Sequence, residues 1–130
     1  QPLEKGSVSI PVWGELKEPM TGKEFAEKIE KVLNRKPLIC IENGPHLIRK
    51  IGICTGGGQG YIDLAAEQGC DAFITGELSE QTIHSAREQG LHFFSAGHHA
   101  TERYGIKALG EWLAKEYGFD VEFKDIDNPA

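Results

Sequence analysis

The sequence predicts an α/β fold, a layered sheet of largely parallel strands with helices on its faces. From Lys50 onward, short apolar runs alternate with longer segments of helical periodicity. The helical segments end at Gly69 and Gly90, and glycine commonly ends a helix. Strands joined through helices need crossover connections, which make neighbouring strands parallel. One core of this kind suits 130 residues, so we expect a single domain over residues 1–130.

The second half of the sequence contains the clearest elements. Apolar runs predict strands at residues 51–54, 72–75 and 91–96, and helical patterns lie between them at 60–69 and 79–90. Ser79 is the expected N-cap of the second of these helices. The α/β prediction rests on this repeated strand and helix unit.

The C-terminal part predicts one long helix followed by one strand. The helix runs from about Thr101 to Tyr117, and its expected apolar face consists of Ile106, Leu109, Leu113 and Tyr117. After Gly118, apolar and polar residues alternate over residues 121–126, which is typical of a half-exposed strand.

The N-terminal part fits the alternation less regularly. Residues 7–13 predict a strand limited by Pro11, and residues 36–41 predict another. A helix is expected between them over residues 21–34, opened by a capping box of Thr21 and Glu24. Its expected apolar stripe consists of Phe25, Ile29, Val32 and Leu33.

Composition argues against several classes of function. The net charge is -6 and the Lys and Arg residues are scattered singly, so the sequence predicts no basic stripe that could bind a nucleic acid. No apolar segment approaches the roughly 20 residues that span a bilayer, and the polar N-terminus differs from a signal peptide. Cys40, Cys54 and Cys70 lack C-x-x-C spacing, so we expect reduced thiols in a cytoplasmic protein. The chain also starts without Met, which indicates a processed or excised piece.

Unusual residues follow three consecutive predicted strands. They are TGGGQG at 55–60, TGEL at 75–78 and GHHATE at 97–102. Ligands of open α/β sheets bind outside the carboxyl ends of the parallel strands. Because parallel strands end at the same edge, we expect the three segments to form one site.

The glycine-rich segment has two interpretations. Gly56, Gly57 and Gly58, with Gln59 beside them, would let a ligand such as a phosphate approach backbone N–H groups at a helix start. The alternative is a tight turn that needs positive φ. The segment is no P-loop, because it lacks the Gly-Lys-Ser/Thr ending, and G-x-G-x-x-G spacing also fails. Its spacing leaves both interpretations open.

Several other polar residues are candidate site residues, but their sequence patterns are less specific. Glu77 lies at the same predicted edge, where it belongs to the site or only complements the dipole of the next helix. Glu80 and His84 lie four apart and would either pair on an exposed helix face or hold a metal. His46 and His92 have no acidic or histidine neighbour at helical spacing, so we interpret them as structural or surface residues.

His98 and Glu102 form the most specific pair. Four apart at a helix start, their side chains project from one face and can reach the same metal ion. The positive end of the helix disfavours the imidazolium and leaves the neutral ring that a metal requires. His99 points away by about 100° if it is helical. Two protein ligands are too few for a stable site, because zinc uses about three or four.

The same residues carry a resemblance to a known family. The run from CTGGGQ to GHHATER and on to GEWL, together with VWGEL, KPL and the final DIDNPA, resembles the C-terminal half of the YbgI-like proteins. These form the bacterial branch of the family named for NGG-interacting factor three, whose members are also called GTP cyclohydrolase one, type two, homologues. The resemblance covers nearly the whole chain.

This resemblance implies a protein about twice as long, with two α/β lobes facing a cleft that holds two divalent metal ions. His98 and Glu102 match the ligands of the C-terminal lobe, with Glu102 shared between the ions. The other lobe would give a His-His-Gly segment and an Asp. That segment is absent here, because the only His-His is followed by Ala100. The resemblance also implies ring-like homohexamers.

Two functions remain open at this stage. The first is a metal-dependent hydrolase of a nucleotide or a related small molecule, like a GTP cyclohydrolase, in which two adjacent metals activate water. The second is a ring-forming binding or scaffold protein whose metals are structural. Zn, Fe, Mn, Ni and Mg all remain candidates for the metals, and the general acid and base are unassigned.

Overall fold

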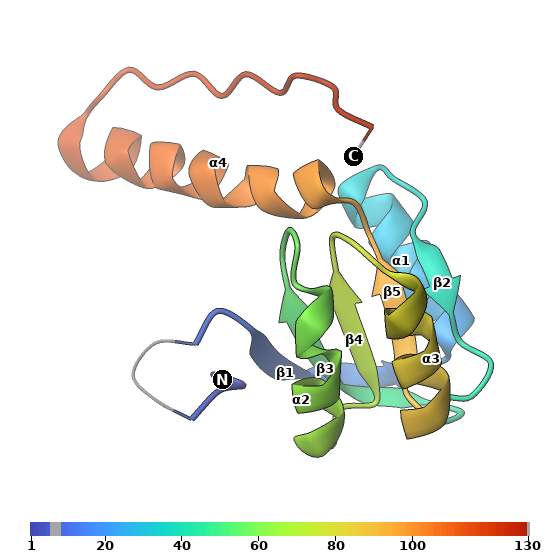
Figure 1. Ribbon diagram of the computed structural model, residues 1–130. Coiled ribbons are helices and arrows are strands. Elements are labelled where there is room, and N and C mark those ends of the chain that lie inside the picture. The colour runs from blue at the N-terminus through green and yellow to red at the C-terminus, as the bar shows by residue number, and fades with distance from the viewer. Residues whose placement is uncertain (6–8, 130) are drawn as a thin grey trace.

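A five-stranded mixed sheet organises the computed structural model, which describes residues 1–5 and 9–129 (Figure 1). The strands are β1 (Val12–Met20), β2 (Leu38–Cys40), β3 (Ile48–Cys54), β4 (Ala72–Thr75) and β5 (His92–Ser95). Their order is β1-β3-β4-β5-β2. The central strands β3, β4 and β5 are parallel to one another. At the two edges, β1 pairs antiparallel with β3, and β2 pairs antiparallel with β5. The predicted α/β fold class, with its largely parallel sheet, is therefore confirmed.

Helices cover both faces of the sheet. They are α1 (Gly22–Leu33), the 3-10 helix η1 (Gln59–Tyr61), α2 (Ile62–Glu67), α3 (Glu80–Gln89) and α4 (His98–Tyr117). The helices α2 and α3 lie on one face, and α1 lies on the other (Figure 1). None of the helices in the described residues combines the length and the apolar character needed to cross a membrane.

The central strands are buried on both faces, which explains why they were predictable. Side chains alternate across a strand, so Phe93 joins the core under α2 and α3 while its neighbour Phe94 joins the core under α1. The same alternation sends Phe73 and Ala72 of β4 to opposite sides. The three cysteines are free and buried in this structure.

Most predicted boundaries agree with the structure. The predicted strands at 36–41, 51–54, 72–75 and 91–96 correspond to β2, β3, β4 and β5. The capping box of Thr21 and Glu24 opens α1, and Ser79 and Gly90 cap the two ends of α3. The predicted helix at 60–69 is split into η1 and α2, and Gly69 has a φ of 70°.

The strand predicted at residues 7–13 is displaced. Residues 7 and 8 lie outside the described residues, and β1 begins only at Val12. It then continues through GELKEPM to Met20, a stretch that the sequence did not mark as a strand. An edge strand has one unpaired side and a half-exposed face, so polar residues such as Glu15 and Lys17 obscure its pattern.

The C-terminal prediction needs two corrections. The helix α4 begins at His98 rather than Thr101, and residues 121–126 are extended but lie in no strand. They run back along α4, and together the two segments project from the sheet (Figure 1). The expected apolar face of α4 also stays exposed at Ile106, Leu109 and Tyr117. The strand is absent because none of the strands described here lies beside this segment.

Candidate functional site

The three strand exits lie together at one edge of the sheet, as predicted. The Gly76 N–H donates to the Gly56 carbonyl at 2.9 Å, and the Gly97 N–H donates to the Gly76 carbonyl at 3.1 Å. These bonds tie the loops after β3, β4 and β5 together. A Cβ on Gly76 would lie 2.7 Å from both the Gly56 oxygen and the His98 Cα, so only glycine permits this approach.

The glycine loop is held by internal hydrogen bonds. The Gly56 N–H donates to Thr101 Oγ1 at 3.0 Å, and the Gly58 N–H donates to the buried Thr75 Oγ1 at 3.1 Å. Thr75 Oγ1 in turn donates to the Gly56 carbonyl. Gly56 has a φ of 64°, and the α-helix that follows η1 is short. Because the protein itself uses these two amides, the geometry favours the tight-turn interpretation over a phosphate cradle.

His98 lies between two carboxylates, one from the loop after β4 and one from the next turn of α4. Its Nδ1 lies 2.6 Å from Glu77 Oε1, and its Nε2 lies 3.1 Å from Glu102 Oε2. The three side chains are about half exposed, at 41%, 46% and 53% for His98, Glu77 and Glu102. The cluster therefore opens to solvent, which leaves room for a further ligand.

The pKa of His98 shifts in the direction opposite to the expectation. The hydrogen bond that His98 donates to Glu77 is the largest influence and raises the pKa of His98 above its ordinary value, with Glu102 acting in the same direction. The positive end of α4 was expected to favour the neutral ring. Two carboxylates within contact distance outweigh that dipole, whose effect is about 1 kcal/mol or less at an exposed position.

The donor atoms suit a divalent metal ion, although their number is small. In the neutral tautomer that donates Nδ1–H to Glu77, Nε2 carries a lone pair beside Glu102, and a bound cation would favour this tautomer, as in the usual arrangement of a carboxylate, a histidine and a metal. A Cβ on Gly56 would fall 2.2 Å from Glu102 Oε1, so glycine keeps that space open. Across residues 1–5 and 9–129, no group of three or more His, Cys, Asp or Glu could hold an ion. The cluster thus offers two candidate metal ligands, His98 Nε2 and the Glu102 carboxylate.

Some of the other candidate site residues lie near the cluster of Glu77, His98 and Glu102, and others lie away from it. Gly57 lies near the cluster, because a Cβ there would be 3.5 Å from Glu77 Oε2. Gln59 begins η1, and its Oε1 is buried without a hydrogen-bond partner. His84 pairs only loosely with Glu80 at 3.9 Å on the exposed face of α3. His99 turns away from His98 to Asp125, 3.3 Å from its Nε2.

The remaining histidines and the cysteines have structural surroundings. His92 is buried, and its Nε2 lies 2.7 Å from the Pro45 carbonyl oxygen. Burial raises the pKa of the Cys54 thiol, so this residue at the end of β3 is a poor nucleophile. His46 takes no part in the cluster.

Sequence reasoning missed three residues that organise the site. Thr75 and Thr101 hold the glycine loop through the bonds described above. Asp125 accepts one hydrogen bond from Arg103 and pairs with His99, which fixes the C-terminal segment against the start of α4. The repeated Thr-Gly at 55–56 and 75–76 was the available signal for Thr75, whereas nothing in the local sequence marks Asp125.

Known proteins are similar in sequence to all or most of this chain. A protein of Haemophilus influenzae, "GTP cyclohydrolase 1 type 2 homolog", is 98% identical over 130 residues, which are 100% of this chain and 52% of the relative. The Escherichia coli K12 protein of the same name is 63% identical over 118 residues, covering 91% of this chain and 48% of the relative. The chain therefore spans about half the length of these curated relatives.

Solved structures are also similar to this chain. The structure titled "protein ybgI, unknown function" has a TM-score of 0.94 and 58% identity, covering 99% of this chain and 51% of that chain. TTHA1606 from Thermus thermophilus has a TM-score of 0.74 and 25% identity, covering 92% and 45%. The match to the Duf34/NIF3 (NGG1p interacting factor 3) family extends over residues 1–129, and the chain therefore belongs to that family.

Proposed function

We propose that this chain is one lobe of a dinuclear metal-dependent hydrolase that acts on a nucleotide or a related small molecule. One observation carries the proposal. His98 is oriented by Glu77 through Nδ1 and presents Nε2 beside Glu102, at the shared edge of three strand exits. This places two ligands of the kind that a divalent metal binds on one rigid helix start.

The protein residues have separable roles in this proposal. Glu77 fixes the orientation and tautomer of His98, and Glu102 supplies the negative charge that a pair of cations needs. Gly56 leaves room for both side chains. A pair of divalent ions, when bound, polarises a carbonyl or phosphoryl oxygen and activates water. The metal would be Zn, Fe, Mn, Ni or Mg, and a second lobe would supply the missing ligands.

A polar groove beside the cluster supports a small-molecule substrate. It has a volume of about 260 Å³ and is lined by Gly57, Gln59, Asp63, Ser79 and Gln81, among others. Its amide and hydroxyl groups suit the hydrogen-bonding edges of a nucleotide. The name of the relatives, "GTP cyclohydrolase 1 type 2 homolog", supports a guanine nucleotide as the first compound to test.

The test compares this chain with the full-length Haemophilus influenzae relative. Calorimetric titration with Zn²⁺, Mn²⁺ and Ni²⁺ is expected to give tight two-ion binding to the full-length protein and weak or no binding to this chain. His98→Ala and Glu102→Ala in the full-length protein should remove most of that binding. His84→Ala is the matched control, because His84 also has a glutamate four residues away but lies outside the cluster.

Turnover of GTP and a nucleotide panel completes the test. Metal-dependent hydrolysis that is lost in His98→Ala but retained in His84→Ala supports the hydrolase. Tight metal binding without turnover of any compound in the panel would favour the alternative, a ring-forming scaffold with structural metals. Tight two-ion binding to this chain alone would show that its own residues complete the site, and would overturn the two-lobe proposal.

Assembly and location follow as further parts of the proposal. We expect the full-length protein to form a homohexamer in the cytoplasm. Sedimentation of the full-length protein measures the first, and cell fractionation measures the second.

A further inference from the structure

The polar groove beside the cluster contains a hydrogen-bonding group that the protein leaves unused. Gln59 lines this groove, and its Oε1 is buried without a hydrogen-bond partner among the described residues. A buried carbonyl oxygen that has lost water without gaining a donor raises the free energy of the folded state. A ligand that supplies an N–H group to this oxygen would remove that cost.

The charges around the groove decide which kind of ligand fits it. Its lining comes from the starts of η1, α2 and α3, and helix starts attract anions such as phosphate. Here the helices already have carboxylates of their own, from Asp63 in the first turn of α2 and from Glu80 in that of α3. None of the described residues that line the groove is Lys or Arg. The groove therefore disfavours a phosphate and favours an uncharged group with N–H donors.

Two hydrogen-bond acceptors lie close together in the wall of the groove. Gln59 and Asp63 are four residues apart on successive helical turns, and both line the groove. Asp63 accepts from Gln89 Nε2 through Oδ1 at 2.5 Å, which leaves Oδ2 for a ligand. Two neighbouring acceptors suit a molecule that has two adjacent N–H donors.

We infer that this groove binds the 2-amino-4-oxopyrimidine edge of a heterocycle, the edge that guanine and pterins share, and that Gln59 determines this specificity. The ring N–H and the amino group of that edge are adjacent donors, so Gln59 accepts from one and Asp63 from the other. Adenine has an acceptor nitrogen beside its amino group and does not supply both. The inference rests on the proposed function and deepens it, because it names the part of the substrate that the groove holds.

Gln59 can turn its amide toward such a ligand at little cost. Its Oε1 breaks no hydrogen bond to the described residues when it moves, and the terminal torsion of a glutamine has a broad energy well. Gly60 also lines the groove, and no atom lies within 4 Å of a Cβ added there. The space beside Gln59 is therefore open to a planar ring.

The groove holds one part of a substrate and adjoins the cluster that would hold the rest. Its volume of about 260 Å³ is below the roughly 300–1,000 Å³ of sites that enclose a whole drug-sized ligand. Gly57 also lines the groove, and a Cβ on Gly57 would lie 3.5 Å from Glu77 Oε2. A heterocycle held by its amino edge would thus extend past Gly57 toward His98 and Glu102.

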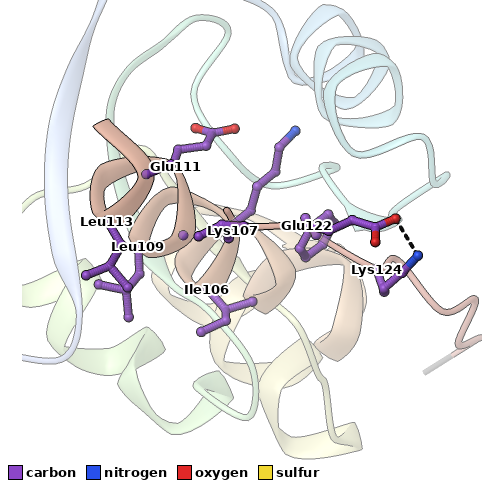
Figure 2. Close-up of a pocket in the computed structure, with 11 residues that line it drawn as sticks. Ile106, Lys107, Leu109, Glu111, Leu113, Glu122 and Lys124 are labelled. Atoms are coloured by element: carbon purple, nitrogen blue, oxygen red, sulfur yellow. Dashed lines mark hydrogen bonds and ion pairs between the residues drawn. The ribbon is translucent and has the colours of Figure 1, made fainter. Parts of the chain in front are cut away.

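A larger hollow of about 600 Å³ lies between α4 and the segment after it, but its chemistry differs. Ile106, Leu109 and Leu113 line it on α4, and its polar residues Glu122 and Lys124 form an ion pair with each other (Figure 2). Within the described residues, no unpaired buried polar atom lines it. The small polar groove, rather than this hollow, therefore suits a polar heterocycle.

Titration of this chain without added metal tests the inference. The probe is guanosine, which has the amino edge but no phosphate, and the chemical shift of the Gln59 side-chain amide reports on the groove. Guanosine should shift this amide saturably, and inosine, which lacks the amino group, should bind at least about tenfold more weakly. Inorganic phosphate should leave the amide unchanged.

A parallel titration with neopterin distinguishes the two sources of this edge. Tighter binding of guanosine assigns the groove to guanine nucleotides, and tighter binding of neopterin assigns it to pterins. Equal binding of guanosine and adenosine would overturn the inference. A Gln59 amide that responds to phosphate, or to none of these compounds, would do the same.

A variant pair separates binding from folding. Gln59→Met keeps the length of the side chain and removes the unpaired oxygen, so guanosine binding should weaken at least about tenfold while the midpoint of thermal unfolding does not fall. Gln68→Met is the matched control, because Gln68 caps the other end of α2 and does not line the groove. Normal guanosine binding by Gln59→Met, or equal losses in both variants, would overturn the role of Gln59. A lower midpoint for Gln59→Met would show that Oε1 has a partner in the folded protein, and would remove the observation on which the inference rests.

The two proposals fail separately. Guanosine or neopterin binding to the metal-free chain, without metal-dependent turnover by the full-length Haemophilus influenzae relative, would keep the groove and sink the hydrolase. Metal-dependent turnover of a compound that lacks this edge, without guanosine or neopterin binding in the groove, would do the reverse.

Discussion

The helices α1 and α4 both carry apolar side chains, but α1 is much more strongly amphipathic and has its apolar face covered, whereas most large apolar side chains of α4 are exposed. The shorter α1 buries Phe25 and Ile29 against the sheet, and the Phe25 ring packs edge-on against Phe94 at 5.2 Å. In the longer α4, Ala100 is the only residue that is buried among those described. An apolar pattern thus predicts that a helix face becomes covered, but it does not say whether the covering surface belongs to the same part of the chain.

The largest expected loss of stability comes from truncating a buried side chain of α1. Phe25→Ala should destabilise this chain by about 3–5 kcal/mol, because it leaves a cavity beside Phe94. Trp112→Ala in α4 removes a larger ring that is 48% exposed and should cost less than about 1 kcal/mol. Urea unfolding of both variants measures the difference. Similar losses would mean that α4 is as well packed as α1 in solution.

A second test addresses the edge where the strand exits meet. Gly76→Ala places a methyl group against backbone atoms of Gly56 and His98 and should cost about 1–3 kcal/mol. Gly60→Ala is the matched control, because no atom lies within 4 Å of its added methyl group. Thermal unfolding of the two variants measures how much stability each substitution costs. If Gly76→Ala were neutral, the loops would be less tightly joined than these contacts indicate.

The same contrast explains which parts of the fold were predictable. The strands β3, β4 and β5 are buried on both faces, so their sequences are short apolar runs that have one interpretation. The edge strand β1 and the tail at 121–126 depend on what lies beside them. The strand predicted at 121–126 is wrong for this structure, because no strand of the described sheet lies beside that segment.

The site was predictable to a similar extent. The sequence alone predicts that Gly56, Glu77 and His98 lie at one edge, because parallel strands end at the same edge of a sheet. It could not show that Glu77 bonds to Nδ1 of His98, since this depends on side-chain directions across two loops. The sequence alone also could not show that Thr75 and Thr101 accept hydrogen bonds from the N–H groups of the glycine loop. These bonds are what favours the tight turn over the phosphate site.

Glycines in the two helices should respond in opposite directions. Gly105→Ala in α4 meets open space and should stabilise the helix by about 0.5–1 kcal/mol, because alanine loses less backbone entropy. Gly22→Ala at the start of α1 places its methyl group 3.0 Å from the His92 ring and should destabilise. Hydrogen exchange of the α4 and α1 amides reads the two local stabilities. A stabilising Gly22→Ala would show that the His92 ring moves aside.

The smallest expected effect is a pH dependence confined to the covered helix. The Glu24 carboxylate accepts from the Thr21 N–H at 2.8 Å, and this bond lowers the pKa of Glu24 below its ordinary value of 4.5. A carboxyl group whose pKa is lower in the folded state stabilises that state above the unfolded value and loses the contribution as pH falls through the folded value. The stability lost in Glu24→Gln should therefore be constant near neutral pH and should shrink below pH 4.5. Glu27→Gln is the matched control, because it removes the same charge from an exposed position of α1 without touching the cap. Urea unfolding across this range measures both variants. If the two lost the same stability at every pH, the capping box would contribute nothing beyond the charge of one carboxylate.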